Sequence, residues 1–486
     1  MNAAYITSEV FPFAKTGGLG DVSGALPIAL SDLGVDIKIF LPRYTTITKK
    51  EFNLKLVPDI GEIIIPVAGK EHLIKVYSSF LPKSKVMVYF IDCPHYFGRF
   101  EIYTKDPDED ERFILFSKAV IETIQRLKWR PDIVHCNDWQ TGLIPIYIKG
   151  NYAWDKLFEK TKTLFTIHNI AYQGMFPLAS ISTADIKHDE LLSNGVCEYF
   201  GKMNFMKTAI LTADALNTVS ETYAKELLLP EFGAGMENFL QARKNDLYGI
   251  LNGVDYNVWN PEVDRFIPHP YSVNALAEKL KNKKALLKRF NLSYRKNIPV
   301  IGIISRLVEQ KGFDIISEGI EELMKLDARW VILGSGNDRY EELINSFVKK
   351  YPKKISSYFG FFDELAHLIE AGADIFLMPS RYEPCGLNQI YSLKYGTVPV
   401  VRKTGGLADT VVDWSESLES KNEPGTGFSF NEYSSKALTS CLEKALKVYG
   451  DKSIWQQIQK NGMQKDYSWK KSAQKYLELY NTLSKP

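Results

Sequence analysis

The sequence predicts an α/β protein made of two doubly wound domains, each with a parallel sheet covered by helices on both faces. Two observations support this fold class. Short apolar runs typical of buried strands alternate with stretches of helical periodicity along most of the 486 residues. The alternation falls into two series, separated by the stretch 248–270, whose Asn, Gly and Pro content is typical of an interdomain junction.

The first series begins close to the N-terminus and supplies the strands of the first domain. Helices are expected around 21–33 and 112–128, the second because apolar residues such as Phe113 and Phe116 recur at helical spacing. A Gly-rich loop at 14–20 joins the first strand to the first helix. The expected strands are 3–8, 36–41, 132–136, 163–167 and 214–219.

The second series repeats the order of strand and helix after the junction, and a last helix, 469–483, follows it. We therefore expect a first domain at 1–247, a second domain at 248–468, and a C-terminal helical segment at 469–486 that packs back toward the first domain. The elements expected in the second series are strands 298–305, 329–334, 374–378 and 398–402 and helices 313–325, 338–350 and 387–395.

Composition and charge narrow the possible partners. Sixty Lys and Arg residues against fifty-eight Asp and Glu leave a net charge of +2, so nothing favours nucleic acid or an anionic membrane as a partner. No apolar run approaches the roughly 18 residues of a membrane span, and the first strand begins almost at Met1, which leaves no room for a signal peptide. The cysteines form no CxxC pair, so a cytoplasmic location is expected. They are Cys93, Cys136, Cys197, Cys385 and Cys441.

The residues that follow each strand are the candidates for a site, because open α/β sheets bind ligands beyond the carboxyl ends of their strands. Glycine lets the backbone approach a phosphate closely, and a helix N-terminus adds free N–H groups and partial positive charge. Arg306 and Lys311 follow strand 298–305 and together could neutralise a diphosphate. The Gly-rich loops that precede helices are 17–20, 386–387 and 404–407.

Common nucleotide and metal motifs do not match this chain. Ser23 takes the third glycine position of a GxGxxG fingerprint and no GxxxxGK[ST] loop occurs, which argues against a dehydrogenase or a P-loop enzyme. No HExxH motif is present, and the DxD patterns within 106–110 favour a solvated acidic loop because no apolar strand precedes them. His168 directly follows strand 163–167, which favours a polar ligand contact.

Seven sequence motifs follow one another in the order found in one known family. KTGGLGDV at 15–22 and HCNDWQTGLIP at 135–145 resemble the KTGGLxDV and HxxDWHxxL motifs of bacterial glycogen synthases and plant starch synthases. The resemblance extends over nearly the whole chain, so it is far more specific than any single motif. The other five motifs are TIHNIAYQG (166–174), ILNGVDYNVWNP (250–261), ISRLVEQKG (304–312), PSRYEPCGLNQIY (379–391) and RKTGGLADTV (402–411).

The resemblance implies the GT-B fold, in which two Rossmann-like domains face each other across a cleft that holds the site. It implies transfer of glucose from a nucleotide sugar, usually ADP-glucose in bacteria, to the non-reducing 4-hydroxyl of an α-1,4-glucan. The anomeric configuration is retained in this family. The expected partners are thus a nucleotide-sugar donor and an α-glucan acceptor, and no metal or pyridoxal phosphate is expected as a cofactor.

The functional residues of the family carry over to matching positions in this sequence. Lys15 and the Gly18 amide are expected to meet the diphosphate from the first domain, and Arg306 and Lys311 from the second. Glu383 is expected to hold hydroxyls of the transferred glucose. The resemblance implies catalytic roles for Lys15, Asp138, His168, Arg306, Lys311 and Glu383. It implies binding of the sugar donor by Lys15, Gly18, Asn169, Arg306, Lys311, Phe361, Cys385, Gly386, Leu387, Thr404, Gly405 and Gly406.

Three residues differ from those usual at the matching positions of related enzymes. Tyr391 stands eight residues after Glu383, where many retaining GT-B enzymes carry a second glutamate, so a carboxylate contact to the ribose is in doubt there. Phe361 stands where many bacterial synthases have a tyrosine, and it can stack on adenine without offering a hydroxyl. Gln140 replaces the usual histidine near the acceptor side and could alter the handling of glucan.

Two rival functions remain open at this stage. A glucan phosphorylase of the same fold would carry lysine-bound pyridoxal phosphate and a longer chain. A non-catalytic glucan-binding or scaffolding paralogue would have lost charged pocket residues, whereas Lys15, Arg306, Lys311 and Glu383 are all present. UDP-glucose is the alternative sugar donor, and the oligomeric state is unknown.

Overall fold

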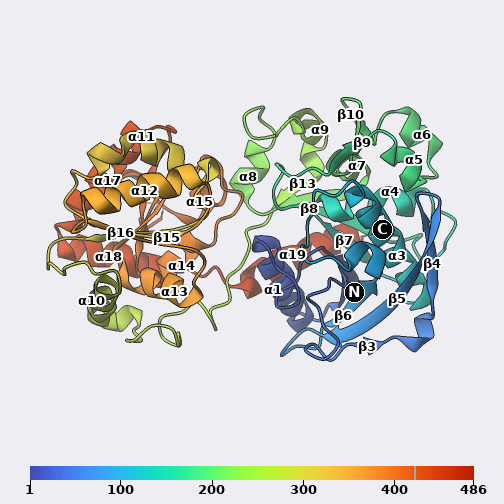
Figure 1. Ribbon diagram of the computed structural model, residues 1–486, viewed down its shortest axis with the longest axis horizontal. Coiled ribbons are helices and arrows are strands. Elements are labelled where there is room, and N and C mark those ends of the chain that lie inside the picture. The colour runs from blue at the N-terminus through green and yellow to red at the C-terminus, as the bar shows by residue number, and fades with distance from the viewer. Residues whose placement is uncertain (421–422, 486) are drawn as a thin grey trace. The chain divides into compact units, whose positions relative to one another are not determined.

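A computed structural model gives the fold of the chain and describes residues 1–420 and 423–485. The chain forms two compact units (Figure 1). Unit 1 comprises Met1–Gly253 together with the chain from Trp469 onward, and unit 2 comprises Val254–Ser468. The first unit ends later than the expected 247, because Leu247–Gly249 is a strand that pairs with Leu216–Thr218 in the sheet of unit 1.

The sheet of unit 1 runs in the order β13-β12-β8-β7-β1-β2-β6-β5-β3, with β4 paired to β5. Strands β13 to β6 are parallel, whereas β5 is antiparallel to β6, β3 and β4. The sequence predicted a parallel sheet, and this end of it is different because β4 alternates buried and exposed residues, as an antiparallel hairpin does. The strands are β1 Asn2–Ile6, β2 Asp36–Pro42, β3 Lys55–Leu56, β4 Ile63–Val67, β5 Lys70–Phe80, β6 Met87–Asp92, β7 Ile133–Asn137, β8 Lys162–Ile167, β12 Ala215–Thr218 and β13 Leu247–Gly249.

Helices and a small antiparallel sheet complete unit 1. The small sheet has the order β10-β11-β9, with bounds Glu198–Tyr199, Lys202–Asn204 and Met175–Pro177. Helix α1 begins at Gly18, earlier than the expected 21, so the Gly-rich motif itself forms the first turn of the helix. The helices are α1 Gly18–Asp32, α2 Pro94–Phe97, α3 Glu109–Arg126, α4 Ile144–Lys149, α5 Ser180–Ala184, α6 Asp189–Ser193, α7 Phe205–Thr212, α8 Glu221–Glu226, α9 Glu237–Ala242 and α19 Trp469–Leu483.

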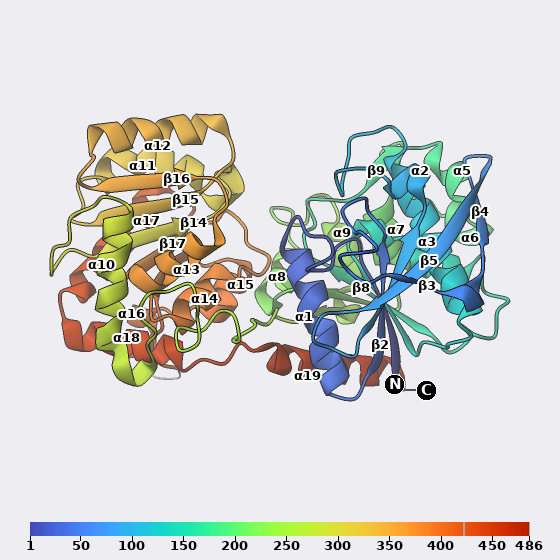
Figure 2. The ribbon, with the colours of Figure 1, turned by 60° about the horizontal axis from the view of Figure 1, so that its bottom comes forward.

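The C-terminal helix α19 is part of the core of unit 1. It lies beside α1, as Figures 1 and 2 show. The buried residues Ala473, Tyr476, Leu479 and Tyr480 recur every three or four positions, so one face of the helix enters the core that also contains Tyr5.

Unit 2 has one parallel sheet in the order β16-β15-β14-β17-β18-β19. One apolar cluster joins this sheet to α11, α12 and α17, and a second joins it to α10 and α13 on the other face (Figure 1). The strands are β14 Val300–Ile304, β15 Arg329–Gly334, β16 Ile355–Phe359, β17 Ile375–Met378, β18 Val398–Arg402 and β19 Phe428–Phe430. The helices are α10 Lys279–Arg289, α11 Phe313–Leu323, α12 Asp338–Lys350, α13 Asp363–Gly372, α14 Asn388–Lys394, α15 Gly405–Thr410, α16 Trp414–Ser420, α17 Ser435–Tyr449 and α18 Lys452–Met463.

The two sheets bring the expected site loops together within each unit. In unit 1, β1, β7 and β8 are neighbours, so the loops that begin at Thr7, Asp138 and His168 leave the same edge of the sheet. In unit 2, β14, β17 and β18 are neighbours, so the loops after Ile304, Met378 and Arg402 also share one edge.

Candidate active site

The loop after β1 is held in shape by a buried carboxylate. Glu9 is 3% exposed, and its Oε2 accepts the backbone N–H groups of Thr16 at 2.6 Å and Gly17 at 3.0 Å. Its Oε1 accepts the hydroxyls of Thr16 and Tyr103, both at 2.7 Å. Glu9 therefore fixes the turn that carries Lys15, and the sequence analysis did not identify it. Its position directly after the first strand was the available signal.

Lys15 and Gly18 lie on the exposed side of this loop. Lys15 Nζ lies 2.6 Å from Asp21 Oδ1, an ion pair across the first turn of α1. A Cβ added at Gly20 would lie 2.9 Å from Lys15 Cγ, so glycine there makes room for the lysine side chain. A Cβ at Gly18 would meet open space. Since the first N–H groups of a helix have no partner within it, the Gly18 amide is available to an anion.

Asp138 and His168 meet at the carboxyl ends of β7 and β8. Asp138 has φ +54°, a conformation that costs energy outside glycine and that often occurs at functional sites. Its Oδ1 accepts the His168 N–H at 2.8 Å, and the N–H of Asn169 also binds its carboxylate. The His168 ring lies with Nε2 3.0 Å from Oδ1 of Asn137.

Burial sets the charge states of these two side chains. It raises the pKa of Asp138 to about 7, against the opposing effect of the N–H groups of His168 and Asn169. It lowers the pKa of His168 to about 3, so the imidazole is neutral in the physiological range. His168 is therefore suited to hydrogen bonding rather than to proton donation as an imidazolium.

Asn169, Trp139 and Gln140 of unit 1 differ in how the protein engages their side chains. Asn169 Oδ1 accepts the Ala171 N–H at 3.1 Å, so its side chain stabilises the turn after His168. Trp139 is 9% exposed and packs against Phe113 with ring centroids 5.0 Å apart, which makes it a core residue. Gln140 is 5% exposed, and its Oε1 has no hydrogen-bond partner among the described residues.

In unit 2, the loops after β14 and β17 are joined by a lysine–glutamate pair. Lys311 Nζ lies 2.6 Å from Glu383 Oε2, and Ser380 Oγ donates to the same oxygen at 3.0 Å. Gly312 has φ +82°, and a Cβ there would lie 2.2 Å from the Pro379 carbonyl oxygen. Glycine thus permits the close approach of the two loops that brings Lys311 to Glu383. Ser380 and Gly312 were not identified from the sequence, although both lie within the quoted motifs.

Arg306 lies in the loop after β14, which ends at Ile304, and it is exposed. Its guanidinium donates to Gln310 Oε1 at a long 3.4 Å. The group therefore has most of its donors available to a ligand. The structure thus brings Lys311 and Glu383 into contact and leaves Arg306 on the adjoining surface.

The turns at 383–387 and 404–406 pack directly against each other. A Cβ at Gly405 would lie 2.0 Å from the Glu383 carbonyl oxygen, and a Cβ at Gly406 would lie 1.9 Å from that of Cys385. The Gly406 N–H donates to the carbonyl oxygen of Glu383 at 3.1 Å. These glycines therefore let the two turns touch, a role in packing besides the binding of the sugar donor that the resemblance implies. Thr404 is fully buried beside them.

The turn before α14 is fixed by one glutamine. Gly386 has φ +68°, and Gln389 donates to the carbonyl oxygens of Cys385 at 3.0 Å and Gly386 at 3.1 Å. Cys385 is buried and Leu387 is half-buried at this turn. The three expected residues therefore form one rigid turn next to Glu383.

The aromatic side chains Phe361 and Tyr391 of unit 2 differ in exposure and packing. Phe361 is 86% exposed in the loop after β16 and is open to a stacking partner. Tyr391 is stacked on Trp259 with centroids 3.9 Å apart, and Trp259 is stacked in turn on His367 at 3.8 Å. The tyrosine at the position of the second glutamate therefore belongs to a three-ring stack. Trp259 was not identified from the sequence as part of it.

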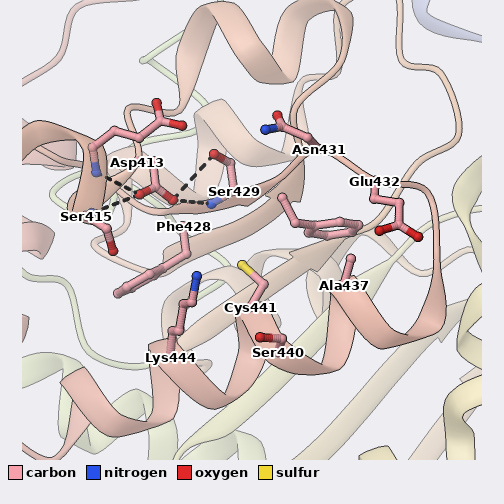
Figure 3. A pocket seen from close by; sticks show the side chains of 12 residues that line it. Asp413, Ser415, Phe428, Ser429, Asn431, Glu432, Ala437, Ser440, Cys441 and Lys444 are labelled. Atoms are coloured by element: carbon pink, nitrogen blue, oxygen red, sulfur yellow. Dashed lines mark hydrogen bonds between the residues drawn. The ribbon is translucent and has the colours of Figure 1, made fainter.

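A hollow of about 380 Å³ lies at the edge strand β19 (Figure 3). Its lining includes Asp413, whose carboxylate accepts the N–H groups of Ser415 and Ser429, and none of the expected site residues.

Among the described residues, no group of three or more His, Cys, Asp or Glu side chains is arranged to hold a metal ion. None of the described helices combines the length and the apolar character needed to cross a membrane.

Sequence comparisons identify relatives over the whole chain. The family profile "Starch synthase catalytic domain" matches residues 2–242, and "Glycosyl transferases group 1" matches 285–463. The glycogen synthase of Geotalea daltonii is 44% identical over 99% of this chain and 98% of its own length. That of Thermotoga maritima is 43% identical over 99% of this chain and 98% of its own length.

Solved structures agree with these relatives. The catalytic domain of starch synthase IV from Arabidopsis thaliana, bound to ADP and acarbose, superposes with a TM-score of 0.89 at 31% identity and covers 99% of both chains. A sucrose-phosphate synthase from Thermosynechococcus elongatus matches with a TM-score of 0.58 at 16% identity, which indicates a shared fold. With two Rossmann-like units and relatives over its full length, the chain belongs to the glycogen and starch synthase family of GT-B glycosyltransferases.

Proposed function

We propose that this protein transfers glucose from ADP-glucose to the non-reducing 4-hydroxyl of an α-1,4-glucan, with retention of configuration. The observation that carries the proposal is the Lys311–Glu383 pair beside Arg306 at the carboxyl edge of the unit 2 sheet. The positive charges of Arg306 and Lys311 suit a diphosphate, and the carboxylate of Glu383 suits sugar hydroxyls. Adenine as the base of the sugar donor is supported by the starch synthase IV structure, which was solved with ADP and acarbose.

The chemistry explains why cations are needed at this site. When C1 of glucose separates from the diphosphate, negative charge develops on the leaving group. Lys15, Arg306, Lys311 and the Gly18 amide can stabilise that charge, and each such contact contributes about 3–4 kcal/mol in a pre-organised site. Lys15 and Gly18 belong to unit 1, whereas Arg306 and Lys311 belong to unit 2.

We propose that the acceptor hydroxyl attacks from the face that the diphosphate leaves, and that the departing phosphate takes its proton. Glu383 supports this path because Lys311 and Ser380 already bind its Oε2. Asp138 supports it because its carboxylate accepts the His168 N–H. Both carboxylates are thus engaged as hydrogen-bond acceptors, whereas double displacement needs a free nucleophile. A glucosyl-enzyme trapped on Asp138 or Glu383 would contradict this path.

Cofactor, partners and location follow from the same proposal. The positive charge comes from lysine, arginine and backbone N–H groups, so the reaction needs neither a metal ion nor pyridoxal phosphate. The partners are a nucleotide-sugar donor and an α-glucan acceptor, without nucleic acid or membrane. A cytoplasmic location is consistent with the five cysteines, each buried as a free thiol.

The decisive experiment offers glycogen with ADP-glucose or UDP-glucose to the purified protein in separate reactions. Released nucleotide and growth of the glucan chains are both measured, with and without chelator. We expect ADP release matched by chain growth, faster than with UDP-glucose and unchanged by the chelator. Release of nucleotide without chain growth, or no turnover of either sugar donor, would contradict the proposal and favour a non-catalytic paralogue.

A further inference from the structure

A row of fully buried polar side chains lies next to His168 in unit 1. Alternate residues of a strand share a face, so His135 and Asn137 of β7 lie on the same face as Thr166 of β8 and His168 just beyond it. The members of this row that are 0% exposed are Tyr5, His135, Asn137, Thr166, Asn217, Tyr476 and Tyr480. Burying such a row of polar groups costs folding free energy unless the groups form hydrogen bonds with one another.

The C-terminal helix supplies two hydroxyls to this row. Tyr480 OH lies 2.7 Å from His135 Nδ1, and His135 Nε2 lies 2.7 Å from Thr166 Oγ1. Asn217 donates to Tyr476 OH at 2.8 Å and to Thr166 Oγ1 at 3.2 Å. Helix α19 thus fixes His135 and Thr166 from a distant part of the chain.

A second set of bonds orients His168 itself. Asn137 Nδ2 donates to the carbonyl oxygens of Ile6 at 3.0 Å and His135 at 3.4 Å. Its Oδ1 therefore faces His168 Nε2 at 3.0 Å and also accepts the Tyr5 hydroxyl at 3.2 Å. An acceptor oxygen requires the hydrogen on Nε2, so the neutral ring keeps a lone pair on Nδ1.

The two sets are in contact with each other. The Tyr5 and His135 rings meet edge to face with centroids 4.9 Å apart. The Thr166 carbonyl oxygen accepts the Asp138 N–H at 3.0 Å, so the same layer also supports the strained residue that binds the His168 backbone. A change at His135 or Thr166 is therefore transmitted to the immediate supports of His168.

We propose that Tyr476 and Tyr480 are positioning residues for His168. Helix α19 holds His135 and Thr166, and this layer supports the Asn137–His168 pair, so that His168 is held as the Nε2–H tautomer with Nδ1 available in the site. The inference rests on the proposed function, because it assigns the effect of the two tyrosines to His168 acting in glucosyl transfer.

The first test removes only the hydroxyls. Tyr480→Phe and Tyr476→Phe are each expected to lower kcat about tenfold, since small displacements in a reacting site are costly, with KM for ADP-glucose changed less than twofold. Tyr147→Phe is the matched control, because Tyr147 is another buried tyrosine of unit 1 and its hydroxyl donates to the Ala184 carbonyl oxygen at 2.8 Å. The control is expected to keep kcat within twofold.

The second test separates positioning from general destabilisation. If the tyrosines act through His168, the loss caused by Tyr480→Phe disappears when it is combined with His168→Ala. The chain has 7 histidines, so selective ¹⁵N labelling is practical, and the His168 signals are those lost in His168→Ala. The wild type is expected to show the Nε2–H tautomer, and Tyr480→Phe a shift of both nitrogen resonances toward tautomer exchange.

The outcomes distinguish this inference from the proposed function. Full activity of both tyrosine variants, together with a strongly reduced but measurable activity of His168→Ala, overturns the inference alone. Equal losses with and without His168, or unchanged His168 resonances in the tyrosine variants, overturn it too. Wild-type turnover in His168→Ala removes His168 from the proposed site as well. If Tyr480→Phe fails to fold, Tyr476→Phe carries the same comparison.

Discussion

Lys311 Nζ lies 2.6 Å from Glu383 Oε2, so the loops after β14 and β17 meet in one ion pair at the carboxyl edge of the unit 2 sheet. Glu383 is 5% exposed, and Ser380 binds the same carboxylate oxygen. Each member of the pair orients the other before a ligand arrives. A sugar donor that binds there meets a cation and a carboxylate whose positions are already set.

Lys311→Ala is expected to damage both stability and turnover. It leaves Glu383 as an unpaired, largely buried charge, which typically costs about 3–5 kcal/mol of unfolding free energy. Turnover is expected to fall about 10²–10³-fold through loss of charge stabilisation. Denaturant unfolding and nucleotide release measure the two effects. Lys325→Ala is the control, because Lys325 pairs with Glu322 at 2.5 Å with both side chains mostly exposed. A Lys311→Ala enzyme as stable as this control would show that the pair is not coupled.

Arg306→Ala is expected to affect turnover alone. Arg306 is exposed and has only a long hydrogen bond to Gln310, so its removal costs the fold little. We expect an unchanged melting temperature and a fall in kcat of about 10²–10³-fold, and the same result for Lys15→Ala. Arg339→Ala, at an exposed position of α12 in the same unit, serves as control. Normal turnover in the Arg306 variant would remove that side chain from the site.

The rate is expected to rise with pH across neutrality. Burial raises the pKa of Asp138 to about 7, so its carboxylate is mostly protonated at pH 6 and mostly ionised at pH 8. If the ionised form is the active one, kcat/KM increases over this interval with an apparent pKa near 7. His168 does not contribute to this rise of kcat/KM with pH, because its pKa is about 3. A flat profile from pH 6 to pH 8.5 would contradict this role for Asp138.

Glu370→Gln is expected to stabilise the protein increasingly as pH rises. Glu370 is fully buried in α13 with one bond from Ser392 at 2.6 Å, and burial raises its pKa from 4.5 to about 8. Between those values the folded state keeps a proton that the unfolded state loses, so the wild type loses stability as pH rises. Gln cannot ionise and does not incur this loss.

Melting temperatures at pH 5, 6, 7 and 8 measure the effect. Each unit of pKa difference corresponds to about 1.4 kcal/mol, or roughly 3–5 °C. The amount by which the melting temperature of Glu370→Gln exceeds that of the wild type should grow from pH 5 to pH 8 and then level off. Burial lowers the pKa of Lys279 to about 7, and its charge interacts with that of Glu370, so the difference measures the two coupled groups together. Glu322→Gln, at an exposed position, is the control variant. A difference in melting temperature for Glu370→Gln that stays constant with pH would contradict the prediction.

The central strands of both sheets were within reach of sequence reasoning. Runs such as 298–305 are apolar throughout because their strands are covered on both faces, and this pattern has few alternative explanations. The edge strands were not predicted, because β16 has only one fully buried residue and β19 is only three residues long. The antiparallel β4–β5 hairpin was not predicted either, because its alternation of buried and exposed residues is typical of a sheet with one face in solvent.

The residues that support the candidate site were harder to predict than its charged residues. Lys15, Arg306 and Lys311 follow strands and carry charge, which marks them in the sequence. Glu9 and Asn137 act through hydrogen bonds to residues that only the fold brings near. Gly405 and Gly406 show the same limit, because their close contacts with the 383–385 turn depend on the register of neighbouring strands.

The return of α19 to unit 1 has a consequence for how the protein is made. The ribosome releases all of Val254–Ser468 before it delivers the helix that completes the core around Tyr5 and His135. Unit 2 is continuous in sequence and can mature during synthesis, whereas the earlier half lacks one helix of its core until residues 469–483 have been made. A nascent chain arrested before residue 469 should therefore expose apolar surface to chaperones on its first-made half.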